Sequence, residues 1–264
     1  MGLLTEQMVN ALRFYTGDVS WWHGEDKEAA FWRDKKAYLV INALFFEGIE
    51  NELARAGEKK FLNPVFFENT ERLLDVCENL IKAIWAGGKD EPLQYGYRVE
   101  RMSSFEKIKQ LGHTISPTST SKTGFLSNYR DKKGLVLLDF TIDQGVPRAD
   151  MGKLLPNYSK AEEKEILIAP WLPLEIRRRS LTEEELTISD YDGQPPGMAY
   201  QITVKQPERM NDVRPKPLDQ AGAEAGRRVL ETILKQEMPK QEDVRAYSLW
   251  KESFRDHLKV RCLN

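Results

Sequence analysis

The stretch Gly134-Leu-Val-Leu-Leu-Asp-Phe-Thr-Ile142 decides the fold class of this chain. It is apolar at successive positions, and a strand that is apolar on both faces is typical of the middle of a covered sheet. Other short apolar or alternating runs lie around it, separated by turn residues, and they predict further strands. These runs cover residues 94–99, 114–121, 165–169, 185–189 and 198–204.

Helical patterns flank this strand-rich region on both sides. Apolar residues spaced three and four apart predict three helices in residues 1–90 and two more from about residue 219. Between the first two strands, one further helix is expected at about residues 105–111. The order of helices, then strands, then helices predicts an α+β fold rather than an alternating βαβ arrangement.

The change of pattern near residue 90 marks the expected domain boundary. Residues 1–90 are predicted to form a helical region packed on the core, and residues 91–264 to form the main domain with its C-terminal helices. No glycine-rich phosphate motif of the Rossmann or P-loop kind occurs in the sequence.

The composition excludes several classes of function. The 264 residues include 39 basic and 41 acidic side chains, and this balance argues against non-specific binding to nucleic acid. Two distant cysteines and three isolated histidines make neither a disulfide framework nor a zinc site, so no metal is expected. Apolar runs are too short for a membrane span, and residues 1–15 lack the pattern of a classical signal peptide. We expect a protein made in the cytosol.

The first motif with chemical potential is Tyr95-Gly-Tyr-Arg-Val99. A strand that places both tyrosines on one face places Arg98 on the other. A guanidinium in that position can bind a phosphate or a carboxylate through two hydrogen bonds. Taken alone, the pattern describes an ordinary surface arginine at least as well.

The second motif, Ile115-Ser-Pro-Thr-Ser-Thr-Ser121, is dense in hydroxyl groups and still alternates as an extended strand does. Hydroxyl side chains can bind a ribose, orient a carboxylate or cap a turn. A polar strand end or a loop would have the same composition, so the motif is ambiguous by itself.

The third motif is Glu162-Glu-Lys-Glu-Ile-Leu-Ile-Ala-Pro170. If the strand begins by Glu163, the carboxylates of Glu163 and Glu165 point to the same face. Two carboxylates on one face repel each other, which favours a cation or a substrate between them. The alternative is a charged loop that precedes an edge strand.

In this order and spacing, the three motifs together resemble the mono-ADP-ribosyltransferases of the Arg–Ser–Glu class. That family contains clostridial binary toxins and arginine-specific vertebrate enzymes, and its motifs are an aromatic-Arg strand, a Ser-Thr-Ser strand and a Glu-x-Glu strand. Residues 155–159 also resemble the loop that enters the family's catalytic strand. The likeness covers about residues 94–173, and it departs from the family pattern at Pro117 and Val99. It implies a core of two packed, mostly antiparallel β-sheets.

The resemblance also implies NAD as the substrate and a role for each motif residue. Arg98 would hold the NAD phosphates, and Ser119 would orient Glu165 by a hydrogen bond. Thr120 and Ser121 would complete the NAD-binding segment. Glu165 would bind the ribose 2′-hydroxyl and stabilise the oxocarbenium-like ribose that forms as nicotinamide leaves.

Three further residues are assigned to the acceptor and the nicotinamide ring by the same resemblance. Glu163 would face the acceptor side chain, and a carboxylate there favours arginine as that acceptor. Tyr158 would contact the protein substrate, although an ordinary packed tyrosine is an equal alternative. Phe125, or alternatively Tyr129, would stack on the nicotinamide.

The expected partner is a protein of a host or target cell, because family members without a membrane anchor are often bacterial effectors or toxins. Such a protein could leave its cell through a specialised secretion system. Two other functions fit the same motifs: an NAD glycohydrolase that transfers ADP-ribose to water, and an inactive relative that serves as a binding module.

Overall fold

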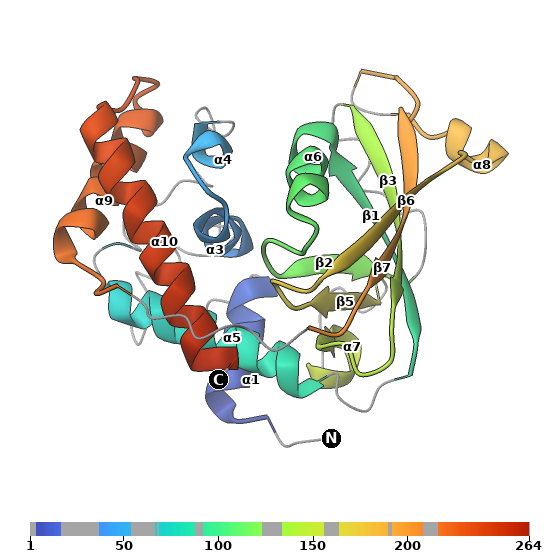
Figure 1. Ribbon diagram of the computed structural model, residues 1–264, viewed down its shortest axis with the longest axis horizontal. Helices are drawn as coiled ribbons and strands as arrows, with labels where there is room; N and C mark the ends of the chain where they lie inside the picture. Colours follow the sequence, from blue (N-terminus) through green and yellow to red (C-terminus); the bar gives the residue numbers. More distant parts are fainter. Residues whose placement is uncertain are drawn as a thin grey trace. The chain divides into compact units, whose positions relative to one another are not determined.

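The computed structural model describes the chain in several stretches, which contain helices and a seven-stranded sheet (Figure 1). The described residues are 4–16, 37–53, 67, 69–87, 92–122, 134–155, 164–189, 192–207 and 216–263. The chain forms two compact units, one of residues 1–3 and 84–209 and the other of residues 4–83 and 210–264. The C-terminal helices thus share a unit with the N-terminal helices, whereas the sequence grouped them with the strands. The packing of residues 1–90 on the core stays a prediction.

The first unit is built on the sheet, whose strand order is β4-β5-β2-β1-β3-β7-β6. Among the described strands, every neighbouring pair is antiparallel except β3 with β7. This arrangement confirms the predicted α+β class with mostly antiparallel strands. The strands are β1 (Gln94–Arg101), β2 (Thr118–Ser121), β3 (Leu135–Ile142), β4 (Arg148–Asp150), β5 (Glu165–Ile168), β6 (Leu174–Arg179) and β7 (Met198–Val204).

Two blocks of strands meet at the junction of β1 and β2, where Tyr97 lies opposite Ser121. Strands β2, β5 and β4 form one block, and β1, β3, β7 and β6 form the other. The two sheets expected from the sequence are therefore two blocks joined within one sheet. A Cβ on Gly96 would lie 2.6 Å from Oγ1 and 2.9 Å from Cβ of Thr120, so glycine lets the two strands approach this closely.

Strand β3 occupies the interior of the larger block, as its apolar sequence predicts. Its side chains are buried except at Asp139 and Thr141, which are half-buried on one face. The opposite face of β1 and β3 is covered by α6 (Met102–Leu111) (Figure 1). There the buried Phe105 packs on Tyr200 of β7, with ring centroids 4.5 Å apart. The α6 helix ends at Gly112, which adopts a positive φ of 68°.

The strand predicted at residues 185–189 is wrong, because this segment begins with a helix. In α8 (Glu183–Leu186), the Thr182 hydroxyl accepts from the Glu185 amide, and the Glu185 carboxylate accepts from the Thr182 amide. This capping box satisfies amide groups that a helix start leaves unpaired. The apolar residue that suggested a strand, Ile188, packs with Leu181 against the end of the β1–β3–β7 face. Strands β4 and β6 and the short helix α7 (Met151–Leu154) were not predicted.

The second unit is helical, and its buried aromatic side chains come from segments far apart in sequence. Phe67 packs on both Tyr247 and Trp250, with ring centroids 5.5 and 5.4 Å away. The N-terminal helical patterns are found as helices, although the second ends at Phe45. The helices are α1 (Glu6–Thr16), α3 (Ala37–Phe45), α4 (Glu50–Leu53), most of α5 (Thr70–Gly87), α9 (Gln220–Leu234) and α10 (Gln241–Leu263). No helix in the described stretches is long and apolar enough to cross a membrane.

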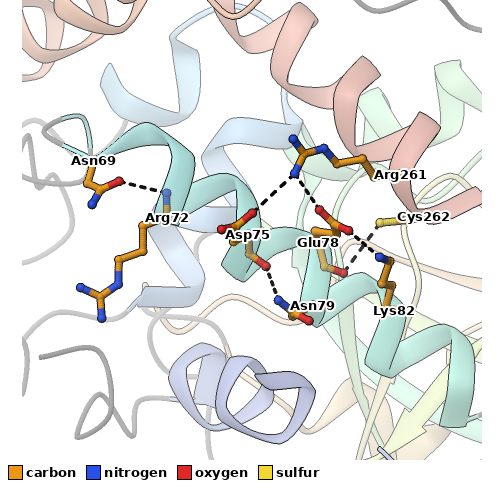
Figure 2. A network of polar contacts seen from close by, with 8 residues as sticks. All are labelled: Asn69, Arg72, Asp75, Glu78, Asn79, Lys82, Arg261 and Cys262. Carbon is orange, nitrogen blue, oxygen red and sulfur yellow. Dashed lines mark hydrogen bonds and ion pairs between the residues drawn. The ribbon is translucent and has the colours of Figure 1, made fainter. Parts of the chain in front are cut away.

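A polar network on the surface of this unit joins α5 to α10 (Figure 2). Arg261 donates to Glu78 at 2.9 Å, and it lies 3.5 Å from Asp75. Lys82 approaches the other carboxylate oxygen of Glu78 at 2.5 Å. Burial alone would raise the pKa of Glu78, but hydrogen bonds from Lys82 and Arg261 outweigh it and lower that pKa below its ordinary value.

Candidate functional site

Arg98 projects from β1 on the face opposite the exposed Tyr95 and Tyr97, as the alternation of the strand predicts. Its Nη1 donates to the backbone carbonyl of Ser119 at 2.8 Å. Its Nε and Nη2 both donate to Oε2 of Glu100, at 2.9 and 2.7 Å. The guanidinium is thus aimed toward β2 by a carboxylate on its own strand. Sequence reasoning did not identify Glu100, although its spacing of two from Arg98 places both on one strand face.

Ser119 and Glu165 meet because β2 and β5 pair in a fixed register. Ser119 lies opposite Leu167, and Ser121 lies opposite Glu165. The Ser119 hydroxyl donates to Oε1 of Glu165, whose residue is 8% exposed. A bonded series therefore runs from the Arg98 guanidinium to the Ser119 carbonyl, and from the Ser119 hydroxyl to the Glu165 carboxylate.

The three residues of the Ser-Thr-Ser segment divide between the two faces of β2. Ser119 and Ser121 are partly exposed and lie on the face of Glu165. Thr120 points the other way, where it is 2% exposed and donates to the carbonyl of Ile166 at 3.2 Å. The structure therefore does not bring Thr120 to the face with the two serines. Its side chain instead packs at the β1–β2 junction.

The backbone turns sharply just before Glu165. Lys164 has a φ of 45°, a left-handed conformation that costs a residue with a side chain about 1 kcal/mol or more. Its carbonyl accepts from the amide of Lys122 at 3.3 Å. The Lys122 ammonium in turn pairs with Asp150 at 2.5 Å. Residues after β2 and at the end of β4 therefore help to fix the start of the strand that carries Glu165.

The far end of β5 is anchored by a buried threonine. The Thr114 hydroxyl donates to the carbonyl of Ala169 and accepts from the amide of Leu172, both at 2.8 Å. The Thr114 carbonyl also accepts from the amide of Trp171 at 2.7 Å. Both ends of the short strand are thus held by bonds to other segments, which limits how far the Glu165 carboxylate can move.

The other predicted site residues lie outside the described residues. They are Glu163, Tyr158, and Phe125 with its alternative Tyr129. In the part of the chain that the structure describes, no group of three or more His, Cys, Asp or Glu side chains is arranged to hold a metal ion.

These groups suit a reaction in which positive charge develops on a bound ligand that also carries anionic groups. A carboxylate held by a hydroxyl stabilises a cation that develops next to it, because the carboxylate needs little reorganisation. A guanidinium held in one direction favours phosphate or carboxylate binding. By strand register, Arg98 projects from the face opposite that of Tyr97 and Glu165, and its guanidinium also pairs with Glu100. Ser119 links the two opposite charges, because its backbone carbonyl accepts from Arg98 and its hydroxyl donates to Glu165.

No family model matches the chain, and no curated protein matches it in sequence.

The solved structures that are similar to this chain include bacterial ADP-ribosyltransferases. An ADP-ribosyltransferase from Clostridium botulinum is 13% identical, with a TM-score of 0.42 over 76% of this chain and 87% of that chain. The Salmonella SpvB ATR domain is 14% identical, with a TM-score of 0.41 over 76% of this chain and 100% of that chain. An ADP-ribosyltransferase toxin from Paenibacillus larvae is 15% identical, with a TM-score of 0.36 over 75% of this chain and 96% of that chain.

Proposed function

We propose that this protein is a mono-ADP-ribosyltransferase that cleaves NAD and transfers ADP-ribose to a side chain of another protein. The observation that carries the proposal is the bonded series of Arg98, Ser119 and Glu165 from three different strands. These are the residues to which the sequence resemblance assigns the family's three motifs. Residues separated by 21 and 46 positions are thus linked by two hydrogen bonds, and this supports the proposal.

The reaction breaks the bond between the ribose C1′ and the nicotinamide nitrogen. Nicotinamide leaves with the bonding electrons, and positive charge develops on the ribose. Glu165 would stabilise that charge and bind the 2′-hydroxyl, with its carboxylate oriented by the Ser119 hydroxyl. Arg98 would bind the pyrophosphate. The acceptor then forms a bond to C1′ and gives up a proton, for which Glu163 is the proposed base.

The acceptor is proposed to be an arginine side chain, because a carboxylate at position 163 can pair with a guanidinium. The target is proposed to be a protein of a host or target cell. Export through a specialised secretion system stays a prediction.

The test is transfer of biotin-tagged ADP-ribose from NAD to proteins of a eukaryotic cell lysate. We expect a discrete labelled band with the wild-type protein. With Glu165→Gln we expect a loss of about a hundredfold or more, since an electrostatic stabiliser of the transition state is removed. A matched control is Glu106→Gln, which changes an exposed glutamate on α6 that lies 3.5 Å from Lys109. Mass spectrometry of the band identifies the modified side chain.

Release of nicotinamide without lysate separates the remaining outcomes. NAD consumed by the wild type and not by Glu165→Gln, with no labelled protein, would assign the site to hydrolysis rather than transfer. Equal labelling by the wild type and Glu165→Gln would refute the proposed role of the Arg98–Ser119–Glu165 series.

A further inference from the structure

Strand β6 forms one edge of the sheet, and its outer side pairs with no strand in the described residues. Its sequence is Leu-Glu-Ile-Arg-Arg-Arg, and it contains no proline that would block a further strand. Edge strands of this kind are templates on which another chain can add by main-chain hydrogen bonds.

The direction of the backbone groups along β6 follows from two hydrogen bonds at its start. The Lys205 amide donates to the Pro173 carbonyl, so Pro173 and every second residue after it face β7. Leu174 faces outward, and its amide donates to the Gly112 carbonyl at 2.8 Å. Ile176 and Arg178 therefore also face outward, and no described backbone group bonds to their amides. These two residues offer the main-chain pattern that a new strand requires.

Two arginines give this edge its charge. Arg177 and Arg178 are both exposed, and neither forms an ion pair with any described residue. Because they are successive residues of a strand, their side chains project from opposite faces. The nearby exposed carboxylate of Glu175 lies 3.8 Å from Lys205, which offsets its charge. A cavity of about 490 Å³ lies beside Arg178 and Ser180, at the end of β6.

The edge lies on the same row of side chains as the candidate catalytic glutamate. The row crosses six strands in register: Glu165, Ser121, Tyr97, Asp139, Gln201 and Arg177. At about 4.8 Å per strand, Arg177 is about 24 Å from Glu165 along this row. A segment bound at β6 would therefore leave the reacting centre open while it holds its protein beside the sheet.

From these observations we infer that the outer edge of β6 binds an extended acidic segment of the acceptor protein. The segment adds to the sheet through the outward backbone groups of Ile176 and Arg178. Two successive acidic residues in it project to opposite faces, where one pairs with Arg177 and the other with Arg178. This inference rests on the proposed function only in taking the acceptor to be a protein.

The experiment measures binding of a fluorescent ten-residue peptide in which two successive glutamates lie between threonine and valine residues. A second peptide carries two lysines in place of the glutamates. We expect the glutamate peptide to bind the wild-type protein, with an affinity that falls as salt is added, and the lysine peptide to bind at least about tenfold more weakly.

Three protein variants separate charge from main-chain pairing. Arg177→Glu/Arg178→Glu should weaken binding of the glutamate peptide by about tenfold or more. Ile176→Pro removes an outward amide without removing a bond to β7, and it should also weaken binding, whereas Ile176→Ala should not. Arg245→Glu changes an exposed arginine on α10 and serves as the matched control for charge. Thermal melting of each variant verifies its fold, and Arg177→Gln/Arg178→Gln replaces the charge reversal if that variant is unstable.

Release of nicotinamide from NAD is recorded in parallel, because the β6 variants should leave it unchanged. Loss of peptide binding with normal NAD cleavage supports the inference. Equal binding of the two peptides would overturn it, as would an equal loss of binding in Arg245→Glu. A protein that binds the glutamate peptide but cleaves no NAD would retain the β6 interaction and refute the proposed enzyme.

Discussion

Glu165 in the first unit and Glu52 in the second are both buried glutamates that accept a hydrogen bond from a hydroxyl. Glu165 accepts from Ser119 and lies opposite the partly exposed Ser121, at the start of a strand. Glu52 accepts from the Tyr247 hydroxyl at 3.1 Å and from the Lys251 ammonium at 2.9 Å. Lys251 is fully buried and also donates to the backbone carbonyls of Ala43 in α3 and of Gly48, which precedes α4.

The difference lies in what surrounds the two carboxylates. Glu52 and Lys251 are enclosed together, and they join α4 to α10 across 199 positions of sequence. Burial lowers the pKa of Lys251, while the Glu52 carboxylate opposes that shift. Glu165 instead borders a row of accessible side chains that leads to the exposed Tyr97. A buried carboxylate can therefore stabilise a fold or serve chemistry, and its neighbours decide which.

The largest expected effect on stability comes from removing the buried cation. Lys251→Met leaves Glu52 charged and enclosed, and this should lower the free energy of unfolding by about 3–5 kcal/mol. Glu165→Gln should change it by about 1 kcal/mol or less, because the amide can still accept from Ser119. Urea unfolding followed by circular dichroism measures both. The double variant Glu52→Gln/Lys251→Met should recover much of the loss, and equal losses in the two single variants would remove the distinction between the two glutamates.

A smaller effect is expected at the junction that brings the site together. Gly96→Ala places a methyl group 2.6 Å from Oγ1 of Thr120, so β1 and β2 must separate. We expect a loss of about 1–3 kcal/mol in the free energy of unfolding, together with a lower rate of NAD cleavage. The second-site change Thr120→Gly removes the atoms in conflict. The double variant Gly96→Ala/Thr120→Gly should therefore recover part of the activity that Gly96→Ala loses. If it does not, the close approach of β1 and β2 is not the reason why glycine is required at position 96.

The sequence correctly predicts the elements whose structure depends on the spacing of neighbouring residues. The apolar run of β3 and the helical spacing of the flanking segments require no knowledge of distant contacts. The three site motifs are also local, but only the family resemblance predicted that they would act together. Strand β6 was missed because its three consecutive arginines lack an apolar alternation, and the edge position of β6 explains how the sheet tolerates them.

The remaining features depend on contacts between segments far apart in the chain. The pairing of Glu52 with Lys251, and the unit shared by the N-terminal and C-terminal helices, cannot be derived from spacing. The contact of Thr120 with Gly96 is a further example. Strand alternation predicts which face of β2 carries the Thr120 side chain, but it does not predict that this side chain meets Gly96. Glu100 was within reach of sequence reasoning, because two oppositely charged residues two apart on a strand share a face.

Glu185 is a third buried glutamate, and it can be compared with Glu52 and Glu165. Glu185 caps α8 and accepts two hydrogen bonds from Arg179, which lower its pKa below the ordinary 4.5 despite the opposing effect of burial. Its contribution to stability is therefore present above pH 4.5 and is lost as the pH falls through the lower, folded-state pKa. We expect Glu185→Gln to cost about 1–2 kcal/mol at pH 7 and progressively less below pH 4. Unfolding curves across this pH range test it, and a cost that does not change with pH would contradict the assignment.

The smallest effect is expected in the exposed network of the second unit, where Arg261 pairs with Glu78 (Figure 2). The Arg261 side chain is 42% exposed, so solvent and salt screen its charge. Arg261→Ala should lower the free energy of unfolding by less than about 1 kcal/mol, and added salt should reduce this loss further. Lys251→Met breaks an ion pair in the same unit, so unfolding of the two variants in parallel compares burial directly. Similar losses would mean that ion pairing itself, and not enclosure from water, makes the Glu52 carboxylate structural.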